Sequence, residues 1–326
     1  MKRYMLTVGS ASRRTLMIGL VASAAACSRP VQPPAASPIE MTGPLIAATV
    51  PMKAAWVVPH NPLTDKSLDK SRLSDEIRRG FKIFTNTPAE APRLAHGGMS
   101  CSNCHLNAGQ REKSLPLVDV AGMFPEYNRR SARLFSLGDR ITDCFLRSEN
   151  ATGGQLSSDE LPDPTSPEVL AISAYLTWLS RGAAMGKNPS WRGQNTIQAA
   201  ALIPVDKLDA AKGEAIYADR CATCHGADGQ GVQIGDKIAG PLWGPRSWND
   251  GAGAARVYTL AGMIRYSMPY LDPGNITDAD VQHVAAFIDS KPRPAFPFKN
   301  RDYRVEKLPS DAVYYTRALK TARLGD

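Results

Sequence analysis

The sequence predicts a mostly α-helical protein with two tandem domains, and three observations lead to this prediction. The pattern C-x-x-C-H occurs twice, at residues 101–105 and 221–225, so that the copies start 120 positions apart. An amphipathic helical pattern precedes each copy, DEIRRGFKIF before the first and DAAKGEAIYADR before the second. A second helix follows each copy, with start signals SPE at 166–168 and TDAD at 277–280.

The N-terminal segment is typical of an export signal. Residues 1–26 contain four cations and no acidic residue, and their apolar run, from Leu16 to Ala26, is too short for a membrane-spanning helix. We therefore expect residues 1–26 to direct export to the periplasm. The sequence SRRTL at 12–16 fits either a twin-arginine signal or an ordinary positively charged start, so the export route stays open.

Cys27 directly follows this signal and begins a Pro/Ala/Ser-rich stretch over residues 27–59. Two interpretations are open, acylation of Cys27 with residues 27–59 as a flexible tether, or simple cleavage after Ala26. We favour the lipid anchor, because one lipid would hold the protein at the membrane. The formal charge of +8 includes the four signal cations, so the charge of the processed chain does not indicate a nucleic-acid partner.

Each C-x-x-C-H motif predicts one covalently attached haem c. Two thiols at this spacing can form thioethers to the two vinyl groups of a haem, while the adjacent histidine binds the iron from the proximal side. A zinc knuckle or a redox C-x-x-C is the alternative, but two copies ending in His in an exported chain favour haem. We therefore predict two cytochrome c-like domains, over residues 60–190 and 205–326, the second with a C-terminal extension. The predicted attachment residues are Cys101 and Cys104, then Cys221 and Cys224, with His105 and His225 as proximal ligands.

Met268 is the predicted sixth iron ligand of the second haem. It lies 43 residues after His225 and directly before Pro269, where a soft thioether can reach the iron from a fixed loop. Met263 is the alternative, but it follows Leu260 at helical spacing and fits a core position. The C-terminal extension beyond residue 292 is expected to pack along the outside of the second domain.

The first domain has no comparable methionine before a proline. Met123 follows His105 too closely, and Met185 comes after the last helix of the domain. Cys144 is better placed, and a thiolate is a suitable iron ligand. The alternative is a buried free cysteine on an amphipathic helix, but the missing sixth ligand favours His105/Cys144 ligation.

The surroundings of Cys144 also suggest anion chemistry. A helix capped by Ser136 would place Arg140, Cys144 and either Arg147 or Ser148 on one face. Arginine beside a cysteine is expected to lower the thiol pKa and favour the thiolate. Three further arginines, Arg129, Arg130 and Arg133, either extend this cationic face or are solvated.

Residues 140–150, RITDCFLRSEN, together with the second haem motif, WNDGAG at 248–253 and SMP at 267–269, resemble the dihaem thiosulfate dehydrogenases. The resemblance spans about residues 60–290. It implies that two thiosulfate ions are coupled to tetrathionate at the first haem. The second haem would pass the two electrons to a periplasmic acceptor, such as a small cytochrome c or a high-potential iron-sulfur protein. It also implies that Cys144 is a distal ligand and reactive sulfur, and that Arg140, Arg147 and Ser148 hold the anion.

Other functions remain open at the level of the sequence. The related sulfur-oxidising cytochromes load thiosulfate onto a carrier protein and share the Cys-ligated haem. A plain dihaem electron carrier would have the same haem motifs without needing an Arg/Cys/Arg face. A dihaem peroxidase would need an open iron position and a distal acid or base, which the sequence does not supply. Glu149 places an acidic residue beside the expected dianion site.

Overall fold

The computed structural model describes residues 61–154, 156–234 and 237–315. The expected export signal at 1–26, the tether at 27–59 and Cys27 lie outside this range. The prediction of a mostly α-helical chain is confirmed, because strands are confined to two short antiparallel hairpins in the described residues. Within the same residues, no helix combines the length and apolar character needed to span a bilayer.

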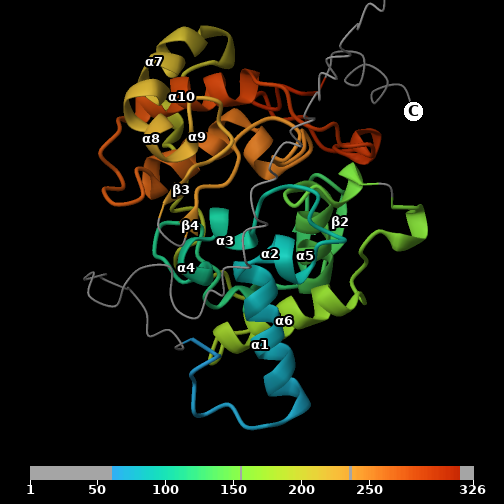
Figure 1. The fold of residues 1–326 in the computed structure, drawn as a ribbon. Helices are drawn as coiled ribbons and strands as arrows, with labels where there is room; N and C mark the ends of the chain where they lie inside the picture. Colours follow the sequence, from blue (N-terminus) through green and yellow to red (C-terminus); the bar gives the residue numbers. More distant parts are fainter. Residues whose placement is uncertain (1–60, 155, 235–236, 316–326) are drawn as a thin grey trace, which may run out of the picture. The chain divides into compact units, whose positions relative to one another are not determined.

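The first half of the described chain contains six α-helices and one hairpin (Figure 1). They are α1 (Arg72–Thr85), α2 (Thr87–Glu90), α3 (Cys101–Cys104), α4 (Leu106–Gly109), β1 (Glu126–Asn128), β2 (Arg133–Phe135), α5 (Leu137–Arg147) and α6 (Pro167–Leu179). Three short 3-10 turns, Val120–Met123, Ala151–Gly153 and Ser158–Glu160, connect these elements.

The second half contains four α-helices and the second hairpin (Figure 1). They are α7 (Ala210–Arg220), α8 (Ala222–His225), β3 (Gln233–Ile234), β4 (Lys237–Ile238), α9 (Val257–Ser267) and α10 (Asp278–Ser290). Further 3-10 turns lie at Ala199–Ala201, Val205–Lys207, Gly253–Ala255 and Lys299–Arg301.

Helices α1 and α6 form the core of the first half. The hydroxyl of Ser71 caps α1 by accepting the Ser74 N–H at 3.3 Å. The amphipathic spacing of α1 then buries Ile77, Phe81 and Phe84 toward α6. Burying side chains of this size stabilises the fold by roughly 1.5–3 kcal/mol each. This packing holds the segment that follows α1, which carries the first C-x-x-C-H motif.

Glycine allows the helices of each half to cross closely. A Cβ atom at Gly80 of α1 would lie 2.0 Å from the carbonyl oxygen of Ala171 in α6. The second half repeats this arrangement, because a Cβ atom at Gly213 of α7 would lie 2.1 Å from the carbonyl oxygen of His283 in α10. Any larger residue would push either helix pair apart. The sequence repeat is therefore also a structural repeat.

Helix α10 forms the core of the second half with α7 and α9. The side chain of Thr277 caps it by accepting the Asp280 N–H at 3.1 Å. Apolar side chains at helical spacing line its buried face, with Val281, Val284 and Ile288 each at most 2% exposed. This second core is separate from the core that α1 and α6 share.

The C-terminal segment packs on the second half, as expected, and also contacts the first half. The Asp311 carboxylate pairs with Arg256 of the second half at 2.8 Å. The backbone N–H of Tyr303, however, donates to the carbonyl of Arg130 in the first half at 2.7 Å. Asp302 also pairs with Arg147 of α5. Buried acidic side chains in this segment need cationic partners, and α5 supplies one.

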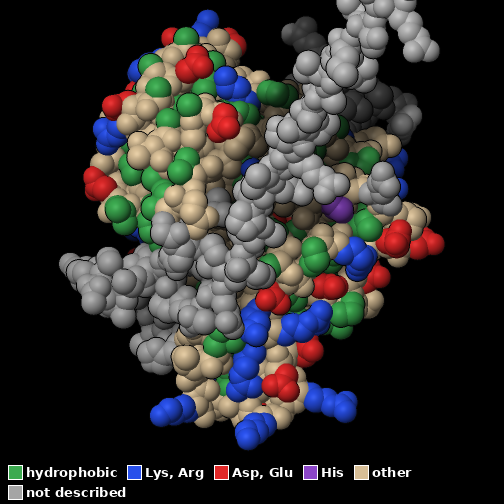
Figure 2. Space-filling view, viewed as in Figure 1, with side chains coloured by type: hydrophobic (Ala, Val, Ile, Leu, Met, Phe, Trp, Pro, Cys, Tyr) green, Lys and Arg blue, Asp and Glu red, His purple; other side chains and the backbone are tan. Residues whose placement is uncertain are grey.

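Lys and Arg side chains gather on the surface around α1 in the view of Figure 2. The exposed cations of α1 and of the loop before it are Lys66, Lys70, Arg72 and Lys82. Part of the positive charge of the chain therefore lies on the surface of the first half.

Candidate active site

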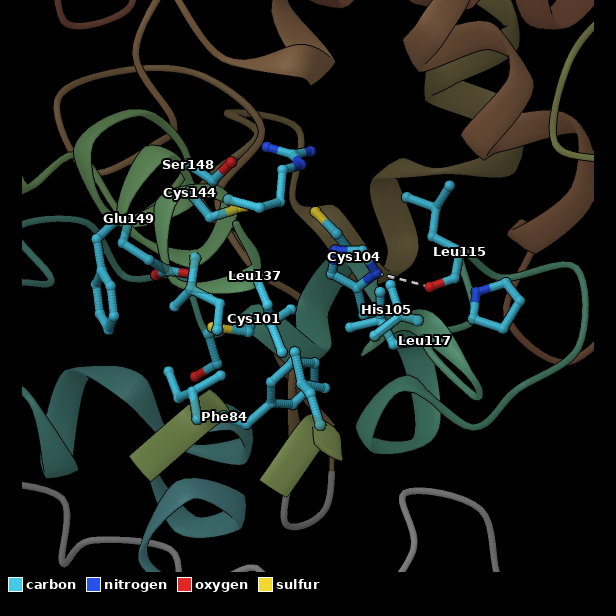
Figure 3. A pocket seen from close by; sticks show the side chains of 18 of the residues that line it. Phe84, Cys101, Cys104, His105, Leu115, Leu117, Leu137, Cys144, Ser148 and Glu149 are labelled. Atoms are coloured by element: carbon cyan, nitrogen blue, oxygen red, sulfur yellow. Dashed lines mark hydrogen bonds between the residues drawn. The ribbon is translucent and has the colours of Figure 1, made fainter. Parts of the chain in front are cut away.

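The first C-x-x-C-H motif and Cys144 meet in one cavity of about 290 Å³. Figure 3 shows Cys144 and Ser148 on one side of this cavity and His105 on the other, with Cys104 next to His105 and Cys101 below Cys144 in this view. His105 and Cys144 are 39 positions apart in the chain, and both contribute to the wall of this cavity. The fold therefore positions the predicted proximal and distal ligands around a shared space.

Helix α5 presents Cys144 to this cavity. The Ser136 hydroxyl accepts the Asp139 N–H at 3.1 Å, and the Asp139 carboxylate accepts the Ser136 N–H at 2.9 Å, which forms a capping box. Ile141 and Phe145 of the helix are buried in the first core. Because these two side chains anchor α5 in the core, Cys144 is held beside the cavity that they help to line.

Both motif histidines are oriented by a backbone carbonyl. The Nδ1 atom of His105 lies 2.6 Å from the Leu115 oxygen, and Nδ1 of His225 lies 3.4 Å from the Gly240 oxygen. A carbonyl can only accept, so Nδ1 carries the proton and the Nε2 lone pair is left for a metal. Burial also lowers the pKa of His105 to about 4, which keeps this imidazole neutral. Each histidine therefore has the tautomer needed for iron ligation.

The residues of the first cavity fit a covalently attached haem. Apolar side chains contribute most of the wall, and the two motif thiols open onto the same space as the imidazole and the Cys144 sulfur. The apolar lining includes Phe84, Leu117, Val120, Phe124, Leu137, Ile172 and Leu176. A largely apolar wall with two attachment thiols and two candidate axial ligands is what a haem c requires.

Arg140 and Ser148 line the cavity with Cys144. They lie four residues before and four residues after the cysteine, so one helical face carries all three. The Arg140 side chain remains 42% exposed and shares the Asp143 carboxylate at 3.4 Å. A guanidinium that is only partly neutralised and still reaches solvent is suited to meet an incoming anion.

Arg147 lies elsewhere, which corrects the expectation that it holds the anion. It is absent from the cavity wall and pairs instead with Asp143 at 2.6 Å and with Asp302 at 2.8 Å. Its guanidinium also donates to the Gly251 carbonyl at 3.0 Å and covers the Phe296 ring. The helix turns about 100° per residue, so position 147 leaves the face that position 148 shares with Cys144. Arg147 is a structural cation.

The upstream arginines do not extend the cavity either. Arg130 pairs with Asp143 at 2.6 Å and Arg133 pairs with Asp139 at 2.9 Å. Neither of them contributes to the wall. Arg133 is a solvated surface residue, since its side chain is 56% exposed. Arg130 is instead largely buried, with its side chain 14% exposed beside Asp143.

Comparisons with known proteins agree with this site. Residues 92–185 match the family described as the SoxA/TsdA cytochrome c domain, and residues 208–288 match cbb3-type cytochrome c oxidase subunit III. A thiosulfate dehydrogenase of Stutzerimonas stutzeri is 37% identical over 237 residues, which cover 72% of this chain and 73% of the relative. One from Allochromatium vinosum is 36% identical over 259 residues, covering 78% and 87%. The chain belongs to the thiosulfate dehydrogenase family.

A solved structure supports the same family. A thiosulfate dehydrogenase, TsdBA, from Marichromatium purpuratum has a TM-score of 0.66 and 32% sequence identity with this chain. The match covers 74% of this chain and 50% of the other, so the chain spans half the length of that protein. The predicted fold of two mostly helical cytochrome c domains is thereby confirmed, as are haem c cofactors.

The electrostatics of this thiosulfate dehydrogenase family member differ in two ways from the expectation. Burial raises the pKa of the Cys144 thiol, and Arg140 offsets only part of that increase. The expected net lowering by arginine is therefore wrong for the polypeptide, because desolvation is the larger effect. Burial also raises the pKa of Glu149 to about 8. This side chain is 3% exposed and neutral at pH 7, so it does not repel an anion.

Sequence reasoning missed several residues of the cavity wall. Trp191 and Arg192 come from the connection between the halves, and Trp248 and Ala254 come from the second half. The Arg192 guanidinium pairs with Glu126, also in the wall, at 2.6 Å. The Trp191 indole N–H donates to the Val118 carbonyl of the first half at 2.7 Å, whereas Trp248 and Ala254 reach the cavity through the packing of the second half on the first. For Trp248, the WNDGAG segment at 248–253 was an available signal.

The second haem motif has a looser environment in the polypeptide. Cys221 is half-buried, Cys224 is exposed, and Met268 is half-buried at the end of α9. Both Cys221 and Met268 pack against the second core. Burial lowers the pKa of His225 below its ordinary value, which keeps that imidazole neutral as well. Ligation by His225 and Met268 stays a prediction.

Proposed function

We propose that this protein oxidises thiosulfate to tetrathionate in the periplasm with two covalently bound haems c. The observation that carries this proposal is the cavity that Cys144, Arg140 and Ser148 share with the first C-x-x-C-H motif. The names of the relatives supply the substrate. The proposed domains are residues 60–190, with the active-site haem, and residues 205–326, with the electron-transfer haem.

Residues of this chain bind and orient the substrate. Arg140 attracts the thiosulfate dianion and directs its outer sulfur toward Cys144, while Ser148 donates to a sulfonate oxygen. The apolar wall excludes water from the sulfur atoms. Because two dianions repel each other, the Arg140 charge is also needed when the second thiosulfate arrives. Arg147, although cationic, is fully engaged by carboxylates and takes no part in binding.

The proposed reaction balances as two steps. As the proposed iron ligand, Cys144 would be held as a thiolate; it joins the outer sulfur of one thiosulfate, which forms an S–S bond and releases two electrons. A second thiosulfate then attacks that outer sulfur, which forms tetrathionate and returns the Cys144 thiolate, as in disulfide exchange. A haem accepts one electron at a time, so the two haems supply the required oxidising capacity. His105, His225 and Met268 are the proposed further ligands.

The test uses the purified holoprotein with thiosulfate and an artificial one-electron acceptor. We expect tetrathionate to form without any added protein, and Cys144→Gly to abolish its formation. The Arg133→Gln variant is the matched control, because Arg133 lies near the same helix but outside the cavity. Turnover only with a sulfur-carrier protein would favour the carrier-loading function. No reduction of either haem by thiosulfate would favour a plain electron carrier.

The proposed cellular setting follows from the N-terminal residues and the chemistry. Residues 1–26 direct export, Cys27 carries a lipid, and a small cytochrome c or a high-potential iron-sulfur protein collects the electrons. Mass spectrometry of the mature N-terminus tests the anchor, and an unmodified Cys27 would contradict it. Electron transfer from the reduced holoprotein to each class of acceptor, followed by stopped-flow absorbance, tests the acceptor.

A further inference from the structure

Arg111 is a buried cation without an acidic partner among the described residues. Its residue exposure is 8%, and its Nη2 atom donates to the Tyr270 carbonyl at 2.9 Å. The guanidinium carbon lies 4.8 Å from the centre of the Tyr270 ring. The Nη1 atom is buried and has no hydrogen-bond partner. The Tyr270 ring and carbonyl therefore satisfy only part of the hydrogen-bonding capacity and charge of the Arg111 guanidinium.

Other buried arginines of this chain are paired with carboxylates. Arg147 has Asp143 and Asp302 within 2.8 Å, and Arg293 has Asp289 at 3.1 Å with its side chain 0% exposed. An unpaired buried charge is strongly destabilising, because desolvation is not offset by an opposite charge. Burial without a counter-ion also lowers the pKa of Arg111. The contrast indicates that an anion outside the polypeptide completes the Arg111 site.

The position of Arg111 narrows the choice of anion. It lies in the loop that follows α4, six residues after His105, and Tyr270 lies two residues beyond Met268. The same loop contacts the end of α9, since the Ser267 hydroxyl donates to the Lys113 carbonyl at 3.5 Å. Arg111 is thus placed between the motif of the first haem and the segment that carries the expected distal ligand of the second. It does not belong to the wall of the first cavity.

We propose that Arg111 binds a carboxylate of haem, and that this carboxylate belongs to the second haem. Each haem c brings two propionates, and a guanidinium fits a carboxylate through two parallel hydrogen bonds. Nη1 is unpaired, and Nη2 can share a second acceptor. Contact with the Met268 segment and absence from the first cavity favour the second haem. The inference rests on the two haems of the proposed function.

This contact would adjust electron transfer between the haems. A positive charge at a propionate offsets negative charge near the iron and so favours the ferrous form. The second haem would thereby accept electrons more readily from the first. Because Arg111 lies in the first domain, a residue of that domain would influence the reduction potential of the haem bound by the second domain.

The test is a spectroscopic redox titration of the holoprotein with Arg111→Gln and Arg111→Lys. We expect Arg111→Gln to lower the reduction equilibrium constant of the second haem about tenfold, which corresponds to about 59 mV for one electron. Arg111→Lys keeps the charge and should restore most of this shift. Resonance Raman propionate bending bands should change in Arg111→Gln, which a purely structural role would not produce.

Arg265→Gln is the matched control. Arg265 lies in α9 three residues before Met268, but its guanidinium pairs with Asp278 at 2.5 Å. Equal shifts in the Arg111 and Arg265 variants would overturn the proposal, as would unchanged potentials and Raman bands in Arg111→Gln. A shift of the first haem alone would support the carboxylate site but overturn its assignment to the second haem. Intact mass shows the number of haems beforehand, so fewer than two would refute the proposed function instead.

Discussion

Arg147 and Asp302 form a buried ion pair that joins α5 to the C-terminal segment. Two hydrogen bonds of 2.8 Å connect the guanidinium to the two carboxylate oxygens. The side chains are only 6% and 2% exposed. Asp143, directly before Cys144, holds the other side of the same guanidinium at 2.6 Å. The C-terminal segment therefore reaches the helix of the candidate active site through one arginine.

Removing the acidic partner should destabilise the protein. We expect Asp302→Asn to lower the free energy of unfolding by about 3 kcal/mol, because the buried Arg147 guanidinium loses one of its two carboxylate partners. Denaturant unfolding of the holoprotein measures this change. Electron paramagnetic resonance should also show a more heterogeneous first haem, since Asp302 supports the helix that carries Cys144.

Asp311→Asn is the control for that variant. Asp311 is also buried in the C-terminal segment, but its partner is Arg256 rather than α5. Its loss should leave the spectrum of the first haem unchanged, whatever its effect on stability. Identical first-haem spectra for Asp302→Asn and the wild type would contradict the support of α5 by this ion pair.

Substitution of Arg140 should weaken thiosulfate binding, whereas substitution of Arg147 should lower stability. Arg140→Gln is expected to raise KM for thiosulfate at least tenfold, about 1.4 kcal/mol, with little change in stability, because its side chain is 42% exposed. Arg147→Gln should instead lower the free energy of unfolding by about 3 kcal/mol and leave KM nearly unchanged. Steady-state kinetics and denaturant unfolding of both variants give this comparison. The reverse pattern would show that Arg147 reaches the substrate.

Cys144 should ligate only one iron. We expect Cys144→Gly to remove low-spin thiolate signals in electron paramagnetic resonance from the first haem and to leave the second haem unchanged. Thiosulfate oxidation should fall with these signals. Two unaltered haem spectra would show that the Cys144 sulfur is not an iron ligand.

Glu149 should make stability depend on pH. Its folded pKa of about 8 lies above the ordinary 4.5, so the folded state holds a proton that the unfolded state releases. Glu149 should therefore lower the free energy of unfolding of the wild type as pH rises from 4.5 to 8, by at most about 1.4 kcal/mol per pH unit. Glu149→Gln keeps the neutral shape and should lack this loss. Denaturant unfolding of both proteins at pH 5 and pH 8 measures the difference, and parallel pH profiles would contradict a buried neutral Glu149.

Local sequence was sufficient for the helices and for the haem motifs. Ser136 and Thr277 correctly predicted the starts of α5 and α10. An N-cap can be predicted locally because its hydroxyl bonds a backbone N–H only two or three residues further along the chain. The two C-x-x-C-H motifs could be recognised in the same way, because each spans only five consecutive residues. Helical spacing also placed Arg140 and Cys144 on one face, but it left Arg147 and Ser148 as alternatives.

Tertiary structure decided which of these alternatives serves the site. Arg147 pairs with Asp302, which lies 155 positions later in the chain, and so does not line the cavity. Only folding brings such distant charges together. The pKa of Cys144 likewise depends on burial by the surrounding fold, which outweighs its neighbour Arg140. The sequence alone therefore indicated the two C-x-x-C-H motifs, several of the helices and the candidate ligands, since these depend on short-range spacing. The folded chain determined which cations remain available, because charge pairing and desolvation depend on distance in space.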